Sequence, residues 1–80
     1  MIEYNLNFEE ALKYVIKENG WVQGEDYGKG VILRLGGFTK CVEVHCFEDD
    51  YSFPLQVNGN CYAQKYRVVH TQPEALKNKD

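Results

Sequence analysis

The sequence contains no hydrophobic run that comes close to spanning a bilayer, which takes about 20 consecutive apolar residues. Residues 1–5, Met-Ile-Glu-Tyr-Asn, also lack the basic segment and apolar stretch of a secretory signal peptide. Basic residues are few, because nine Lys and Arg stand against twelve Asp and Glu, a formal net charge of −3. Proteins that bind nucleic acid or anionic membranes present a basic face. We therefore expect a soluble, cytoplasmic protein that binds neither nucleic acid nor membrane.

Cysteines are too few and too irregularly spaced for a disulfide scaffold or a zinc site. Cys41, Cys46 and Cys61 are an odd number, which favours free thiols in a reducing compartment. Cys41 and His45 share a strand face but lie roughly 13 Å apart along it, and Cys46 points the other way. Structural zinc needs two close pairs of ligands. We expect no metal and no cofactor.

A recognisable catalytic set is also missing. Cys41, Glu43 and His45 fall on one face of an expected strand, but no donor for an oxyanion is apparent beside them. A Walker-type phosphate loop is excluded as well, because the Gly-Lys-Gly turn at residues 28–30 leads into a strand and not into a helix. The sequence therefore predicts a binding protein and not an enzyme.

Eighty residues suffice for one small domain, which we place at residues 1–70. Residues 71–80 form a polar C-terminal tail that contains Pro73 and is expected to fray. A core of this size leaves roughly 3–5 kcal/mol of stability, so association of several copies would help. The aromatic residues are six Tyr, four Phe and one Trp. Such a Tyr-rich set fits either a small core or an interface and ligand site.

Residues 8–19 have the pattern of an amphipathic helix. Asn7 is a good N-cap, and Glu10 stands three residues on, as in a capping box. Asn19 and Gly20 provide a left-handed stop. Five apolar residues fall on one helical face: Phe8, Ala11, Leu12, Val15 and Ile16.

The rest of the chain has the pattern of strands and turns, with expected strands at residues 21–23, 31–35, 39–47, 51–53 and 66–70. Residues 61–64 are ambiguous and could form a helical turn. We predict an α+β domain in which one N-terminal amphipathic helix packs on a four- to five-stranded, mostly antiparallel sheet. The sheet face that carries Glu43 and His45 is expected to be too polar for a second core. It would serve as a ligand platform or a subunit contact.

The turn at residues 26–30, Asp-Tyr-Gly-Lys-Gly, is the strongest candidate for a ligand site. Gly28 and Gly30 can take positive φ and direct N–H groups outward, with the cation of Lys29 between them and the ring of Tyr27 beside them. This combination suits a small anionic ligand with a flat base. An ordinary loop selected for its backbone geometry would have the same sequence.

Four further residues could contribute to such a site. Arg34 and Arg67 lie in expected strands, where an arginine either reaches the sheet rim or anchors an anion. Trp21 and Tyr66 are the additional rings that could stack on a base. Whether these side chains converge on the turn cannot be read from their spacing.

Three segments, taken in order, resemble one known family. They are residues 7–13 (Asn-Phe-Glu-Glu-Ala-Leu-Lys), residues 22–30 with their Gly-Lys-Gly turn, and residues 61–69. The last is similar in spacing to a Leu-Leu-Ala-x-Asp-Trp-x-Val-Val ending. The family is the Thoeris anti-defence-two type of small phage sponge protein, and the resemblance covers about residues 6–70. The chain departs from the family's pattern at four points: Gln23 and Gly24 replace frequent basic residues, Tyr27 replaces a Trp, one residue is missing before Gly28, and Lys65-Tyr66 replaces Asp-Trp.

The resemblance implies a non-catalytic function. Such proteins sequester a nucleotide immune signal, a cyclised ADP-ribose or a cyclic oligonucleotide, before it activates its effector in the infected bacterium. It also implies a homo-oligomer, commonly a tetramer, with ligand pockets between subunits. The rings named above would then stack on the base, and the cations and glycine amides would meet phosphate.

A second hypothesis belongs to a different class of function. A small phage protein could inhibit a host defence protein by docking on its surface. The tyrosine-rich sheet face and the acidic turn at residues 48–50 would then form the interface.

Overall fold

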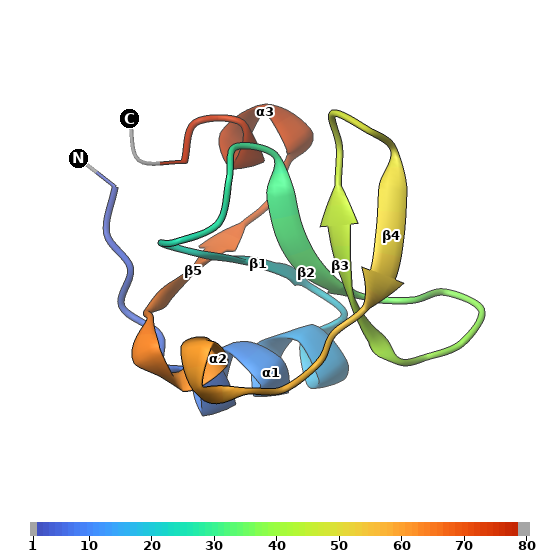
Figure 1. The fold of residues 1–80 in the computed structure, drawn as a ribbon, viewed down its shortest axis with the longest axis horizontal. Coiled ribbons are helices and arrows are strands. Elements are labelled where there is room, and N and C mark those ends of the chain that lie inside the picture. The colour runs from blue at the N-terminus through green and yellow to red at the C-terminus, as the bar shows by residue number, and fades with distance from the viewer. Residues whose placement is uncertain (1, 79–80) are drawn as a thin grey trace.

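One helix packs on a five-stranded sheet in the computed structural model, which describes residues 2–78 (Figure 1). The elements are α1 (Phe8–Glu18), β1 (Trp21–Gly24), β2 (Val31–Leu35), β3 (Val42–Cys46), β4 (Tyr51–Pro54), α2 (Gly59–Ala63), β5 (Tyr66–Val69) and α3 (Gln72–Ala75). Every strand pair is antiparallel, in the order β4-β3-β2-β1-β5. The chain therefore runs as a meander from β1 to β4 and returns through α2 to place β5 beside β1. The predicted α+β fold is confirmed.

Helix α1 begins and ends where its caps predict. The Asn7 side chain accepts a hydrogen bond from the Glu10 amide at 2.8 Å, and the Glu10 carboxylate accepts one from the Asn7 amide at 2.9 Å. Asn19 ends the helix in the left-handed conformation, with φ of 54°. The buried face is narrower than predicted, because Ile16 remains 53% exposed.

The main core lies between α1 and one face of the sheet. It is formed by Phe8, Ala11, Val15, Val22, Leu33, Val44, Cys61 and Tyr66. Helix α2 lies beside α1 below the sheet (Figure 1), and Tyr62 of α2 meets Phe8 of α1 with ring centroids 4.9 Å apart. Helices α1 and α2 therefore cover the same side of the sheet.

The opposite face of the sheet contains a second, smaller core. Ile32, Val69 and Ala75 are buried together there, with the partly buried rings of Trp21 and Phe47 against them. The expectation that this face is too polar for a core is therefore wrong for the part that α3 covers. The polar side chains that prompted it lie farther out on the same face, towards β4.

The segment after His70 does not fray as predicted. Thr71 caps α3 by accepting a hydrogen bond from the Glu74 amide at 3.3 Å, and a proline lies in the first turn, where it needs no hydrogen bond. Ala75 and Asn78 are buried, so the segment packs on the sheet. This short capped helix was not predicted because the segment is polar and has no apolar periodicity of its own. The last two residues of the expected tail, 79 and 80, lie outside the described residues.

Smaller differences concern the ends of elements. The strand expected at 39–47 is limited to β3, because residues 36–41 form a turn in which the Gly36 amide donates to the Cys41 carbonyl at 2.8 Å. The ambiguous residues 61–64 lie largely within α2, which Asn58 caps.

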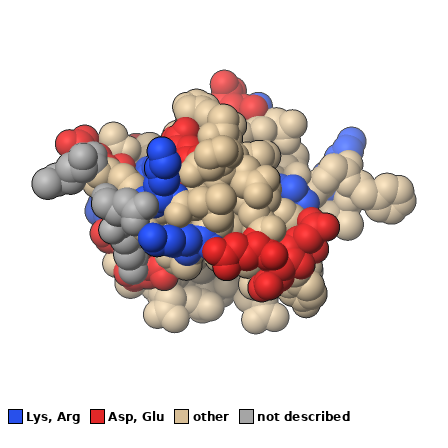
Figure 2. All heavy atoms as spheres, turned by 90° about the horizontal axis from the view of Figure 1, so that it is seen from above, with Lys and Arg blue, Asp and Glu red and all other residues tan. Residues whose placement is uncertain are grey.

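No helix within residues 2–78 has the length and apolarity needed to cross a membrane. On the face seen in Figure 2, Lys and Arg atoms lie in separate groups among acidic ones.

Candidate functional site

A cleft of about 670 Å³ opens beside the turn between β1 and β2. Its apolar wall is formed by Val31 and Val44 from the sheet, Phe53 at the edge, and Leu55 from the connection that leads to α2. The predicted turn also lines the cleft, through Asp26, Gly28 and the ring-bearing Tyr27. The cleft has the size of a small-molecule site, for which volumes of about 300–1,000 Å³ are usual.

The remaining wall of the cleft is lined by carboxamide side chains, namely Gln56, Asn58, Asn60 and Gln64. Gln64 is buried, and its carbonyl oxygen accepts a hydrogen bond from the Asp26 amide at 3.0 Å. The Asn58 oxygen accepts from the Asn60 amide at 2.9 Å. These two side chains therefore support the wall while contributing to its polar surface. No signal in the sequence links these four residues to the turn, because they lie about 30 residues or more from it along the chain.

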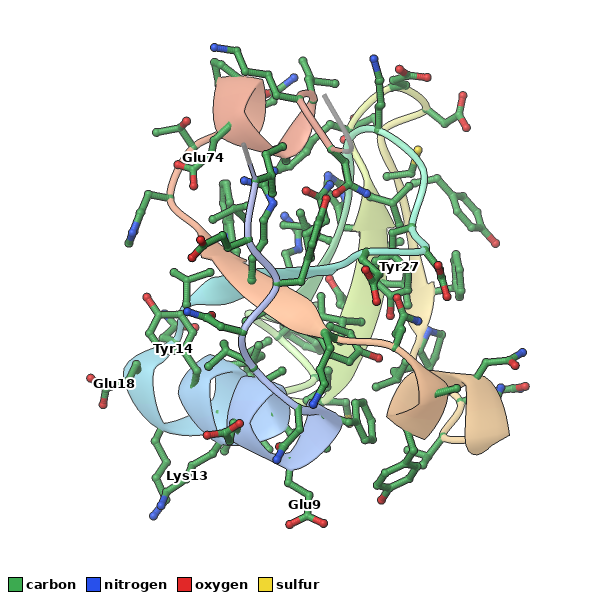
Figure 3. The ribbon with its side chains drawn as sticks, turned by 90° about the vertical axis from the view of Figure 1, so that its left-hand side faces the viewer. Glu9, Lys13, Tyr14, Glu18, Tyr27 and Glu74 are labelled. Carbon is green, nitrogen blue, oxygen red and sulfur yellow. The ribbon has the colours of Figure 1, made fainter. Side chains whose placement is uncertain are left out.

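Tyr27 stands at the turn between β1 and β2, above α2 (Figure 3). Its ring is half-buried and meets the ring of Tyr66 edge-on, with centroids 6.1 Å apart. Burial raises the pKa of the Tyr27 hydroxyl to about 12, and a hydrogen bond with Tyr66 offsets part of that rise. The hydroxyl is therefore neutral at physiological pH, and Tyr27 offers the cleft a ring and an uncharged polar group.

The C-terminal segment braces the turn. The Asn78 amide donates to the carbonyl of Tyr27 at 2.5 Å and to the carbonyl of Gly24 at 3.3 Å, and the Tyr4 hydroxyl donates to the Asn78 oxygen. Asn78 is buried, so these bonds are shielded from water. No local signal in the sequence marks Asn78, which lies in the segment expected to fray.

The two glycines of the turn have different roles. Gly30 has φ of +79°, its amide donates to the Ala75 carbonyl at 3.0 Å, and its carbonyl accepts from the Phe47 amide at 2.9 Å. The Gly30 amide is therefore used inside the protein and does not point at a ligand as expected. Gly28 does not take positive φ, but it lines the cleft. Lys29 lies exposed between them.

Arg67 and Tyr66 are part of the framework. The Arg67 guanidinium is buried and donates to the Gln23 side-chain oxygen at 2.7 and 3.2 Å and to the Glu74 carbonyl at 2.8 Å. Tyr66 is fully buried, and its hydroxyl donates to the Cys61 carbonyl at 2.9 Å. Within the chain, neither side chain is placed to stack on a base or to meet phosphate as expected.

Arg34 and Trp21 lie on the other face of the sheet. Arg34 donates to the Glu43 carboxylate at 3.2 Å, and Trp21 packs on Phe47 with ring centroids 5.3 Å apart. The eight predicted site residues therefore do not converge within the chain. Tyr27 and Gly28 line the cleft, Lys29 follows them, and the other five serve elsewhere.

A second polar cluster on that other face was not predicted. His45 Nδ1 lies 2.6 Å from Ser52 Oγ, which also accepts a hydrogen bond from Arg34 at 3.4 Å. Burial, together with the neighbouring Arg34, lowers the pKa of His45 below its ordinary value of 6.5. Among residues 2–78, no three His, Cys, Asp or Glu side chains lie close enough to hold a metal ion. The cluster joins β2, β3 and β4 through neutral and paired groups.

Comparison with protein-family models found no match, and searches of curated proteins and of solved structures found none either.

Proposed function

We propose that the protein binds and sequesters a nucleotide immune signal in the cytoplasm of an infected bacterium without converting it. The signal would be a cyclised ADP-ribose or a cyclic oligonucleotide. The main structural support is the cleft beside Tyr27, which has a nucleotide's scale and borders the turn on which the sequence resemblance depends. The class of ligand and the biological setting come from that resemblance.

The walls of the cleft suit the base of such a ligand. Tyr27 and Phe53 provide aromatic surface, and stacking of a base on one ring contributes about 1–3 kcal/mol. The carboxamides provide both donors and acceptors for the edge of the base. The phosphates would extend past Gly28 towards Lys29, at the exposed side of the turn.

Assembly into a homo-oligomer, with the tetramer implied by the resemblance, is part of this proposal. The outer edge of β4 pairs with no strand among residues 2–78, whereas the outer edge of β5 is bridged by Leu6. Tyr51 and Phe53 on β4 are 59% and 44% exposed. An exposed edge with aromatic side chains favours pairing with another chain. Because Phe53 also lines the cleft, a partner at this edge would extend the ligand site.

Titration calorimetry with cyclic ADP-ribose isomers and cyclic dinucleotides tests the proposal. We expect tight binding of at least one ligand, and its recovery unchanged when the protein is denatured afterwards. Tyr27→Ala should weaken binding at least about tenfold, in line with the loss of one stacking ring. The matched variant Tyr62→Ala, which removes an exposed ring outside the cleft, should bind as the wild type does. Absence of binding to every member at micromolar concentration would contradict the proposal.

The second candidate, docking on a host protein, is supported by one observation. The exposed rings of Tyr51 and Phe53 follow directly on the exposed acidic residues Glu48, Asp49 and Asp50, which gives a mixed aromatic and acidic surface. This candidate requires a monomer in solution that forms a stoichiometric complex with a purified defence protein. A homo-oligomer that buries β4 would exclude it.

A further inference from the structure

The charge of the cleft is opposite to what a phosphate site needs. Asp26 is the one ionised side chain that lines it, and no Lys or Arg within residues 2–78 does so. Lys29 and Lys65 are next to lining residues in the chain, but they do not form part of the wall. A phosphate placed inside the cleft would face a carboxylate without a neighbouring cation in the wall. The anionic part of a nucleotide therefore belongs outside it.

The same walls fit an uncharged heteroaromatic base. The Asp26 carboxylate is a pure acceptor and pairs with amino or imino groups, and charge-assisted hydrogen bonds of this kind are stronger than neutral ones. Apolar walls and the Tyr27 ring cover the faces of the base, while Gln56 and Asn60 offer amide donors and acceptors to its edge. The chemistry of the cleft is thus that of a base pocket.

The backbone that carries the acceptor is held in place before any ligand arrives. The Asp26 amide donates to the Gln64 side chain at 3.0 Å, and the Tyr27 amide donates to the Gly24 carbonyl at 3.0 Å. A Cβ at Gly24 would lie 2.1 Å from the Gln64 oxygen, so the close approach of these two residues depends on the missing side chain. With Asn78 bonded to the Gly24 and Tyr27 carbonyls, the backbone beneath Asp26 is fixed on both sides. Such preorganisation lowers the entropy cost of binding.

We infer that the cleft recognises the base of its ligand as an uncharged unit, with Asp26 as the residue that determines specificity. This inference rests on the proposed function and makes it more specific. The base enters the cleft, its exocyclic amino group donates to Asp26, and the phosphates stay in solvent at the mouth, on the side of the exposed Lys29. Affinity then depends on the identity of the base and only weakly on the phosphate charge.

Titrations of the full chain with nucleosides and with their 5′-monophosphates, followed by protein NMR, test the inference up to millimolar ligand. We expect adenosine, guanosine or cytidine to bind within about threefold of its own monophosphate, because a solvent-exposed phosphate interacts weakly. Uridine, which lacks an amino group, should bind more weakly than the best of these. Asp26→Asn should weaken binding of the best nucleoside about tenfold, through loss of a charge-assisted bond. Asp49→Asn, the same change outside the cleft, should have no effect.

Salt provides a second measurement that needs no variant. Nucleoside and monophosphate binding should change less than about twofold between about 50 and 500 mM NaCl, because salt screens interactions between charges and the base that supplies the affinity is uncharged. Binding of monophosphates or cyclic nucleotides without nucleosides, or a steep loss with salt, would overturn the inference and leave the proposed function standing. Failure of nucleosides, monophosphates and cyclic nucleotides alike would overturn the proposed function itself.

Discussion

At the scale of single residues, Gly30 is required by the backbone. An alanine there would hold φ near +79°, where side-chain residues cost about 1–2 kcal/mol, and its Cβ would lie 2.9 Å from Leu76 Cδ2. We expect Gly30→Ala to lower the free energy of unfolding by about 1–2 kcal/mol in urea titrations. Gly28→Ala is the matched control, since its Cβ meets only Val31 at 3.8 Å and should change stability by less than about 0.5 kcal/mol. Equal losses for both variants would show that positive φ is not the cause.

His45 should make stability depend on pH. Its pKa in the folded protein is lowered from 6.5 by burial and by Arg34, against the smaller opposite effects of Asp50 and Glu43. The unfolded chain therefore takes up the proton first as pH falls below 6.5, and protonation favours unfolding. We expect a thermal midpoint that is flat above that pH and decreases below it. His45→Gln should reduce this decrease, whereas His70→Gln, at an exposed position, should retain it.

At the scale of elements, the side chain of Gln23 connects the sheet to α3 through hydrogen bonds. Its amide donates to the Ala75 carbonyl at 2.8 Å and to the Val31 carbonyl at 3.1 Å, while its oxygen accepts from the buried Arg67. Gln23→Leu removes all of these hydrogen bonds, so that the Ala75 carbonyl keeps only the Gly30 amide and Arg67 keeps only Glu74. We expect a loss of about 2–3 kcal/mol of stability. Hydrogen exchange at the Gly30 amide, which donates to Ala75, should accelerate as α3 loosens.

A matched substitution tests whether the loss of stability comes from the hydrogen bonds of Gln23 or from removing any glutamine side-chain amide. Gln56→Leu removes the same groups from an exposed position and should change stability by less than about 0.5 kcal/mol. The double variant Gln23→Leu with Arg67→Met should recover part of the loss, because the buried guanidinium that has lost its Gln23 partner is then absent. A double variant no more stable than Gln23→Leu alone would contradict the proposed coupling.

The same elements explain how much the sequence could predict. Helix α1 and strand β2 depend on local signals, a capping box and a short apolar run between turns, and both lie within a residue of the predicted bounds. Helix α3 was missed because its stability comes from partners about 50 residues away, such as Gln23. At the site, the glycines and the lysine of the turn at 26–30 are a local signal that predicts a ligand-binding turn. The carboxamide side chains that line the same cleft carry no such signal, because they come from a distant part of the chain. Residue type alone did not distinguish the buried, fully bonded Arg67 from a ligand-binding arginine.

At the scale of the whole molecule, the two edges of the sheet differ. Leu6 exchanges two backbone hydrogen bonds with Tyr66, at 2.8 and 2.9 Å, and so covers the β5 edge. Strand β4, at the other edge in Figure 1, has no such cover among residues 2–78. Its register with β3 places Tyr51 and Phe53 opposite Cys46 and Val44. The open edge and its exposed aromatic side chains therefore form the surface at which we propose that a second copy pairs.

Tyr51→Lys tests whether this surface assembles. A lysine on an edge strand opposes edge-to-edge pairing, so we expect the oligomer seen by light scattering to dissociate to monomers in this variant. Tyr62→Lys introduces the same charge at a residue of almost equal exposure, 60% against 59%, and should remain assembled. A wild-type protein that is monomeric at every concentration would contradict the proposal. If Tyr51→Lys dissociates, its ligand affinity should fall too, because Phe53 lines the cleft and the proposed partner at β4 would extend that wall.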